Sequence, residues 1–326
     1  MEGTDLVLMK STVRSDADAN GGRVSYTQVS SGVLNNMFPN VTQSERTAGV
    51  TRYRKFFFRN KNASDETAVN SRIWISSRST GGDYFRLKAG TDTDVQSAAD
   101  DYTSWLGTGY VSTALAADST SLEATFDAAT GVYAGSVIRL SDSSGGEEFL
   151  TIASGGVSWN GNVATITCTS GARSTYPASQ NSLVCGVVDL GDLVASTAAW
   201  TETSAAGTYD EATYPVSVNN KGTVSDTWTL TFTGATTFTV SGANTGSVGS
   251  GSTASAFQPI NSAEGSGNYY FEILAAGWGG TWAVGETVTF TTTHAMAGVW
   301  VKEVVPAGCA AQTSNLMTLK LYGEGS

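Results

Sequence analysis

Hydrophobic and polar residues alternate along much of this chain with the two-residue period of a half-buried β-strand. The clearest case is the stretch of residues 226–242, DTWTLTFTGATTFTVSG. Threonines occupy one face of its first half, and the other face carries Trp228, Leu230 and Phe232. Phe238 and Val240 continue the apolar face after a turn. Because successive side chains of a strand point to opposite sides, this pattern predicts an antiparallel hairpin with one buried and one solvated face.

More strand candidates follow at intervals of about 8–12 residues, the spacing typical of an immunoglobulin-like β-sandwich. They are residues 268–278 (NYYFEILAAGW), 285–295 (GETVTFTTTHA), 297–308 (AGVWVKEVVPAG) and 315–324 (NLMTLKLYGE). The segment VVDLGDLVASTAAW is a plausible domain boundary before them. We therefore expect residues 189–326 to form a C-terminal immunoglobulin-like β-sandwich that folds by itself.

Two further β domains are expected before this one. Residues 112–188 contain short apolar runs separated by turn sequences such as SSGGEE and NGN, which predicts a small middle barrel or sandwich. Residues 1–111 contain the β-rich runs TRYRKFFFRN, SRIWIS and YFRLK, which predict an N-terminal β domain with a basic face. A short helix before these runs is expected to be capped at Thr42 or Ser44, with Glu45 in its first turn. The predicted class is all-β, with several small antiparallel domains and almost no helix.

The composition agrees with many short strands joined by turns. The 326 residues include 37 glycines and five prolines, and only 14% of them are charged. Helical domains would carry more Leu, Glu and Lys in periodic blocks. The first residues, MEGTDLVLMKSTVRS, lack the basic flank and apolar core of a secretory signal, and no later run reaches the apolar length of a membrane span. We expect a protein made in the cytoplasm, with no membrane partner.

Charge is distributed unevenly along the chain. Residues 1–100 hold thirteen Lys and Arg and eleven Asp and Glu, whereas residues 101–326 hold five and eighteen. The two parts therefore have net charges of +2 and −13, against −11 for the whole chain. Since acidic surfaces repel phosphate backbones, any contact with nucleic acid would be local to the first hundred residues.

Few residues are suited to catalysis. The single histidine, His294, rules out a metal site with two histidines, and its place at a strand end favours a packed or capping role. The adjacent pair Glu147 and Glu148 would point to opposite faces of a strand, so it does not supply the two facing carboxyls of a glycosidase. We expect no enzyme activity, no catalytic residues, and no metal or other cofactor.

Two groups of residues leave alternatives open. The loop GTDTDVQSAADD has oxygen ligands for calcium in Asp92, Asp94, Asp100 and Asp101, but it lacks the glycine and terminal glutamate of an EF-hand loop, which favours an ordinary solvated loop. The three cysteines show no metal-ligand spacing. Cys168 and Cys185 are either buried free thiols or partners in a disulfide across a β ladder.

The stretch TRYRKFFFRN places four of the eighteen Lys and Arg among four aromatic rings. In a strand, Phe56 and Arg54 share one face while Phe57 and Lys55 share the other, so both faces mix charge with aromatic rings. A nucleic-acid grip is one interpretation. We favour a contact with protein on both faces, the acidic partner lying on a neighbouring copy. The predicted docking residues are Arg52, Tyr53, Arg54, Lys55, Phe57 and Arg59.

The segment GWGGTW suggests a second kind of site. Trp278 and Trp282 would form a stacking platform for a carbohydrate if they were exposed. The alternative is that both rings fill the core beside a turn.

Parts of the sequence resemble a known group of proteins. The segments LNNMFPNVTQSERTAGVTRYRKFFFRNKN and SRIWI, and later TWTLTFTGATTFTVSG, YYFEI, GWGGTWAVGETVTF and VWVKEVVPAG, are similar to uncharacterised virion structural proteins of tailed bacteriophages. The resemblance covers residues of about 30–80 and 200–310. It implies a particle component and carries no catalytic residues.

This resemblance sets the functional expectation. We expect a virion structural protein, assembled in the cytoplasm of a host bacterium, that binds other copies of itself and other phage virion proteins at the neck, tail or baseplate. Nucleic acid is disfavoured as a partner. The alternatives are a capsid decoration protein and a host-surface adhesin or carbohydrate-binding module.

Overall fold

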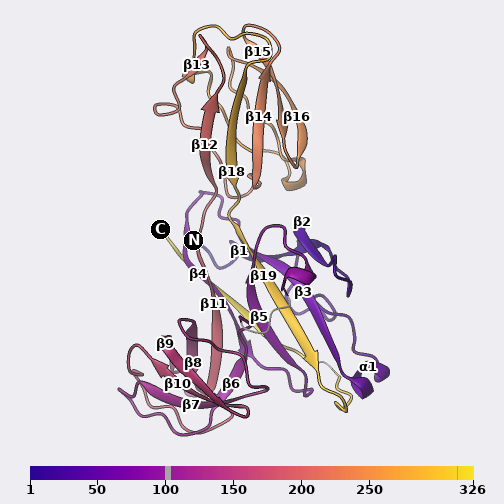
Figure 1. Cartoon of the computed structure of the whole chain (residues 1–326), viewed down its shortest axis with the longest axis vertical. Helices are drawn as coiled ribbons and strands as arrows, with labels where there is room; N and C mark the ends of the chain where they lie inside the picture. Colours follow the sequence, from indigo (N-terminus) through magenta and orange to yellow (C-terminus); the bar gives the residue numbers. More distant parts are fainter. Residues whose placement is uncertain (100–103, 314) are drawn as a thin grey trace.

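The computed structural model describes residues 1–99, 104–313 and 315–326, and its strands pair in antiparallel sheets. The expected all-β class is confirmed. Three parts follow one another along the long axis of the molecule (Figure 1). We call them the head (residues 196–293), the body (the N-terminal and C-terminal strands) and the barrel (residues 108–187), with the body in the middle.

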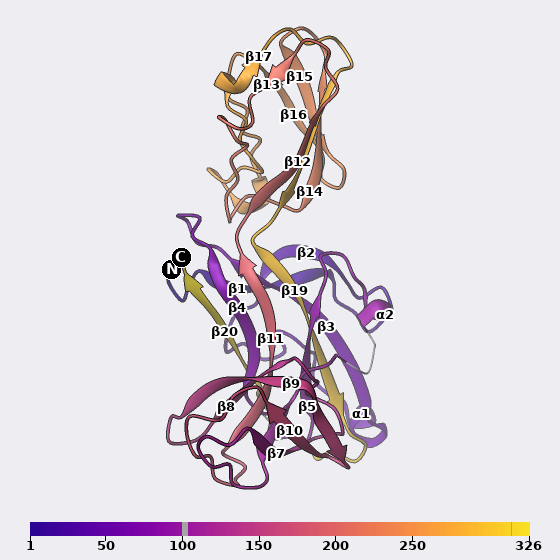
Figure 2. The ribbon, with the colours of Figure 1, turned by 60° about the vertical axis from the view of Figure 1, so that its left-hand side comes forward.

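The body is a sandwich of two sheets. The first has the order β2-β1-β3-β19-β5 and is formed by β1 (Leu6–Val13), β2 (Gly21–Gln28), β3 (Val50–Asn60), β5 (Tyr84–Gly90) and β19 (Met296–Val305). The second contains β20 (Thr318–Gly325), β4 (Ala68–Ser77) and the second half of β11 (Leu183–Leu193). Phe56, Phe58, Trp74 and Val299 belong to the core of the body. The two ends of the chain lie side by side at the body (Figure 2).

The predicted short helix is present as α1 (Gln43–Ala48). The Thr42 hydroxyl accepts the Glu45 backbone N–H at 3.3 Å, and the Glu45 carboxylate accepts the Thr42 backbone N–H at 2.7 Å. This reciprocal capping box satisfies donors that the start of a helix leaves unpaired. The other α-helix among the described residues is α2 (Gln96–Ala99). Within these same residues, no helix has the length and apolar character needed to cross a membrane.

The barrel is a closed ring of six strands. The first half of β11 pairs with β6 on one side and with β8 on the other, which closes the order β11-β6-β7-β10-β9-β8. Its other members are β6 (Thr108–Val111), β7 (Ser121–Phe126), β8 (Val137–Ser141), β9 (Glu147–Asn160) and β10 (Val163–Cys168). A small barrel was expected over residues 112–188, and it begins a few residues earlier because β6 is part of the ring. Ile138, Leu140 and Ile166 lie in its core.

The head is built on one five-stranded sheet. Its order is β12-β18-β14-β15-β16, formed by β12 (Ser196–Glu202), β14 (Asp226–Phe232), β15 (Thr237–Gly242), β16 (Gly246–Ser252) and β18 (Thr287–Thr293). β14 and β15 are the predicted hairpin, and the apolar residues of the alternating pattern are buried. The second layer consists of long loops with the 3-10 turns η1 (Ser262–Glu264) and η2 (Ala275–Gly277) and the short pair β13 (Thr208–Tyr209) and β17 (Trp278–Gly279). It is therefore not the full second sheet of an immunoglobulin fold.

The expected C-terminal domain of residues 189–326 needs correction. β19 leaves the head and pairs with β3 in a continuous register from Met296 opposite Arg59 to Val305 opposite Val50. β20 likewise pairs with β4 in the body. β11 also runs through the expected boundary at residue 189, because its first half closes the barrel and its second half joins the body. The head is thus an insertion, entered through residues 194–195 and left through residues 294–295.

Candidate functional site

The strand predicted to dock on a partner lies inside the body. β3 has β1 on one side and β19 on the other, and both of its faces are covered. The six predicted docking residues are each at most 6% exposed, and they are Arg52, Tyr53, Arg54, Lys55, Phe57 and Arg59. They are not available to a second molecule, so the predicted docking surface is wrong. The mixture of charges and rings on both faces does reflect contact with protein, but that protein is the same chain.

Each buried cation of β3 has an acidic partner within the chain. Removing a charge from water is unfavourable unless an opposite charge and hydrogen bonds compensate it. Three of the carboxylates lie on loops of the body or the head, and the fourth lies on the neighbouring strand β19. The pairs and their shortest N–O distances are Arg52–Glu303 at 2.9 Å, Arg54–Asp16 at 2.6 Å, Lys55–Asp94 at 2.5 Å and Arg59–Glu264 at 2.6 Å.

Asp94 and Asp92, which were considered as calcium ligands, contact side chains of the same chain. Asp94 receives the Lys55 ammonium and also accepts the indole N–H of Trp300 at 2.7 Å. Burial lowers the pKa of Lys55, while its hydrogen bond to Asp94 opposes that shift. Asp92 lies 3.3 Å from the imidazole of His294. Asp100 and Asp101 lie outside the described residues, and among the described ones no group of His, Cys, Asp and Glu is arranged to hold a metal ion.

His294 lies in the second connection between head and body. The ring is buried, and it packs edge-on against Phe57 with 6.4 Å between the ring centroids. Its backbone N–H donates to the Ser225 hydroxyl in the head at 3.2 Å. Burial lowers the pKa of the imidazole, and the Asp92 carboxylate opposes that shift. The packed role expected for this histidine agrees with its position.

Of the two tryptophans proposed as a carbohydrate platform, Trp282 is part of the head core and Trp278 is partly buried against it. Trp282 is 3% exposed, and its ring stacks on Phe232 with a centroid distance of 4.1 Å. Trp278 packs edge-on against Tyr209 at 4.7 Å and against Trp282 at 5.5 Å. Since the second layer of the head is made mostly of loops, large rings are needed to fill the space beneath them. The platform is therefore wrong, and core packing is the observed alternative.

The cysteine pair left open by the sequence is not bonded. Cys168 and Cys185 are both free and buried. Burial raises the pKa of Cys185 to about 12 and that of Cys168 to about 11. Because the thiolate is the reactive form, both behave as small apolar core residues.

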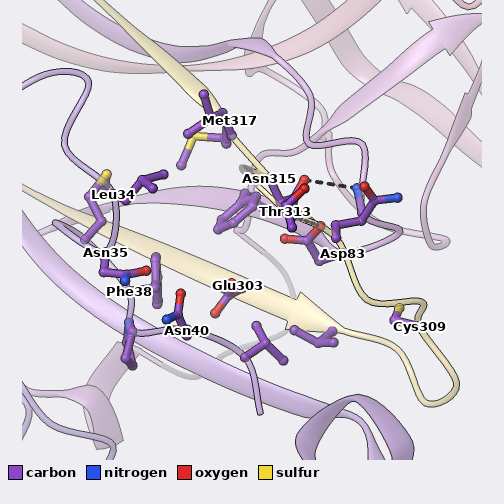
Figure 3. A pocket seen from close by; sticks show the side chains of 18 of the residues that line it. Leu34, Asn35, Phe38, Asn40, Asp83, Glu303, Cys309, Thr313, Asn315 and Met317 are labelled. Atoms are coloured by element: carbon purple, nitrogen blue, oxygen red, sulfur yellow. Dashed lines mark hydrogen bonds between the residues drawn. The ribbon is translucent and has the colours of Figure 1, made fainter. Parts of the chain in front are cut away.

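A groove lies at the end of the body away from the head, and Figure 3 shows its lining residues from close by. Its volume is about 650 Å³, and it lies between residues 33–41 on one side and residues 309–313 and 315–317 on the other. Phe38, Phe85 and Met317 line it and also pack against the core of the body. One wall of the groove is thus apolar and continuous with a packed core.

The lining also contains two carboxyl groups, those of Glu303 and Asp83. Glu303 is 4% exposed and lies directly across the β ladder from Arg52. Burial raises the pKa of Glu303 from its usual 4.5 to about 7, with Arg52 opposing and Asp83 reinforcing that shift. Asp83 is itself part of the lining, and its carboxylate accepts the side-chain amide of Asn315 at 2.6 Å. Arg46 of α1 is the lining cation, so the lining contains two carboxyl groups and one guanidinium.

The rim of the groove carries exposed apolar side chains. Seven large apolar residues are exposed in the described part of the chain, and three of them lie here. These three, Val33, Leu34 and Leu316, are each 58% exposed. Single exposed aliphatic residues are common, but a cluster beside a hollow indicates an interaction site.

The sequence did not single out this groove. Its two sides are separated by more than 260 residues, and neither has a periodic pattern. The sequence offered one local indication of the groove. Val33, Leu34 and Met37 are apolar residues in an Asn-rich segment that belongs to no strand or helix. Such residues are either buried by something distant or left for a partner.

Comparison with known proteins adds no relative to this picture. No protein-family model, no curated protein and no solved structure matches the chain.

Proposed function

We propose that this chain is a structural component of a tailed-phage virion, which assembles with copies of itself and docks on other particle proteins at the neck, tail or baseplate. It acts by binding and not by catalysis. The resemblance of residues 30–80 and 200–310 to such virion proteins gives the class, and the architecture supports it.

The observation that carries the proposal is the way in which the three parts are joined. The barrel and the body share β11, whose two halves belong to different sheets. The head and the body are joined by two short connections and by the buried Arg59–Glu264 pair. Shared strands and buried cross-links hold the parts in fixed positions, as a scaffold protein requires, whereas independent domains move on flexible linkers.

The use of the polar residues supports the same function. The cations of β3 form ion pairs that hold segments of the chain together, and the single histidine is a buried packing residue 3.3 Å from Asp92. The adhesin alternative depended on exposed Trp278 and Trp282, but Trp282 lies in the head core and Trp278 packs against it. The other alternative, a capsid decoration protein, is also a virion structural protein and differs only in its place on the particle.

The proposal is tested by looking for the chain in purified particles. Virions whose genome encodes this chain would be purified on a density gradient, analysed by mass spectrometry, and labelled with an antibody against the head. We expect the chain in stoichiometric amount and the label at one location on every particle. Absence of the chain from infectious, fully purified particles would overturn the proposal.

A further inference from the structure

We propose that the groove of the body binds an extended segment of a partner protein that presents an apolar side chain beside a lysine or arginine. This inference rests on the proposed function, because it names the kind of segment that an assembling virion protein would dock. The proposed binding site differs from the docking site predicted from the sequence. It lies in the groove and not on the buried strand β3, and its lining contains carboxyl groups where β3 carries cations.

The shape and the rim favour a protein segment over a small molecule. Small-molecule sites enclose most of the ligand surface, whereas this groove is open along a rim where Leu34 and Leu316 are exposed. An open hollow with aliphatic side chains on both sides matches the pockets that receive the side chains of an extended peptide. Leu34 and Leu316 come from the two separate segments that line the groove.

The charge of the lining selects a basic neighbour for that side chain. Asp83 and Glu303 are two carboxyl groups in the lining, and Arg46 is the single lining cation. The Glu303 carboxylate already pairs with the Arg52 guanidinium. The Asp83 carboxylate accepts a hydrogen bond from the neutral side-chain amide of Asn315. Asp83 is therefore the lining carboxylate that is left to meet an incoming ammonium or guanidinium group. A carboxylate at the same place would be repelled.

The remaining polar lining suits a peptide backbone. Asn35 and Asn40 are exposed at the groove, and their side-chain amides can each donate and accept hydrogen bonds. Peptide groups of an extended segment require both functions along their length. Aliphatic pockets, an acidic anchor point and amide groups together define the chemistry of the proposed segment.

The test is a selection from a random-sequence peptide library on the immobilised full-length chain. Enriched peptides are synthesised and their affinity is measured by calorimetry. We expect the enriched sequences to contain Lys or Arg beside a large apolar residue. We also expect replacement of that basic residue by glutamine to weaken binding about tenfold, the order expected for a charge-assisted contact. Enriched sequences without a basic residue, or no enrichment at all, would overturn the inference.

Variants locate the binding. Leu34→Ser combined with Leu316→Ser removes the apolar rim without changing charge, and Asp83→Asn removes the acidic anchor while keeping an acceptor for Asn315. Each is expected to weaken peptide binding about tenfold. Val284→Ser is the matched control, because Val284 is an exposed aliphatic residue of the head, far from the groove. Equal binding by the Leu34/Leu316 variant and the wild type would contradict the proposed site. All these positions are on the surface, and circular dichroism checks the folding of each variant.

The two proposals fail in different ways. If the chain is present in virions but no basic-apolar peptide binds the groove, the function stands and the groove inference falls. If the peptides bind as expected but the chain is absent from virions, the groove is a docking site of a protein with another function.

Discussion

The guanidinium of Arg59 lies 2.6 Å from the carboxylate of Glu264, and this buried contact joins the central sheet of the body to the head. A second nitrogen of the same guanidinium donates to the carbonyl of Lys221, also at 2.6 Å and also in the head. The side chain of Arg59 is fully buried, and that of Glu264 is 8% exposed. A residue predicted to face another molecule is therefore a buried polar link between two parts of its own chain.

Removing one member of this pair should be costly. Glu264→Ala leaves the Arg59 charge buried without its partner, and we expect a loss of about 3 kcal/mol in the free energy of unfolding. Urea unfolding followed by tryptophan fluorescence measures the change. Asp189→Ala is the control, because its pair with Arg72 is 3.5 Å long and partly exposed to solvent, and such surface pairs contribute less than about 1 kcal/mol. Equal effects of the two substitutions would contradict the assigned role.

Reversing a buried cation should prevent folding and not only assembly. Lys55→Glu would place a carboxylate beside Asp94 in a site closed to water, so we expect loss of the body fold, visible as loss of dispersed amide signals in NMR spectra. Arg14→Glu, at an exposed position, is expected to fold normally. A folded Lys55→Glu variant that fails only to join particles would restore β3 as a docking strand.

The wild-type chain should not bind DNA in a salt-sensitive way. Binding of phosphates by Lys and Arg releases counterions and weakens steeply as salt rises. The cations of β3 are buried in ion pairs, and the remainder of the chain is acidic. A mobility-shift titration at low salt is expected to show no complex. A shift that disappears with added salt would show that other basic residues form a nucleic-acid site.

Glu303 should make stability depend on pH. Its pKa in the folded chain is about 7, above the 4.5 of an exposed glutamate, so its contribution is fully present below about pH 4.5 and is lost as the pH rises through 7. Glu303→Gln has no such dependence. Between pH 5 and pH 8 we expect the free energy of unfolding of the wild type to fall by up to about 3 kcal/mol relative to that of the variant. Parallel stability curves for the two proteins would contradict the assignment.

His294 should act in the opposite direction. Burial lowers the pKa of its imidazole, so the stability it contributes is present above about pH 6.5 and is lost as the pH falls. Replacing it in a His294→Gln variant should remove this loss, as measured by urea unfolding between pH 7.5 and pH 5. NMR titration of the single imidazole provides an independent check. A pKa at or above the usual value would mean that pairing with Asp92 outweighs burial.

The head should fold alone, but not with the boundaries expected from the sequence. Residues 194–295 contain the five-stranded sheet and a complete core, so this fragment is expected to give dispersed amide signals. The fragment 189–326 would add β19 and β20 without β3, β4 and β5, their partners in the body. Unpaired strands promote aggregation, so we expect the longer fragment to be less soluble. Equal behaviour of both fragments would argue against the insertion.

Local signals in the sequence predicted the local structure well. The hairpin of β14 and β15 follows from strict alternation, the helix α1 from a capping box within four residues, and the barrel from closely spaced turns. Each of these depends on side chains a few residues apart along the chain. The all-β fold class and most of the strands could therefore be assigned without a structure.

The partners of each strand and of each charge were decided only by the tertiary structure. Alternation shows which face of a strand is apolar, but the hydrogen bonds of β19 reach β3 across more than 230 residues, and no local pattern encodes that choice. For the same reason, the sequence of β3 showed that its cations needed acidic partners but not that Glu264 and Glu303 would supply them from the same chain. The groove is equally nonlocal, since its two sides come from opposite ends of the chain and meet only when β19 joins the N-terminal sheet.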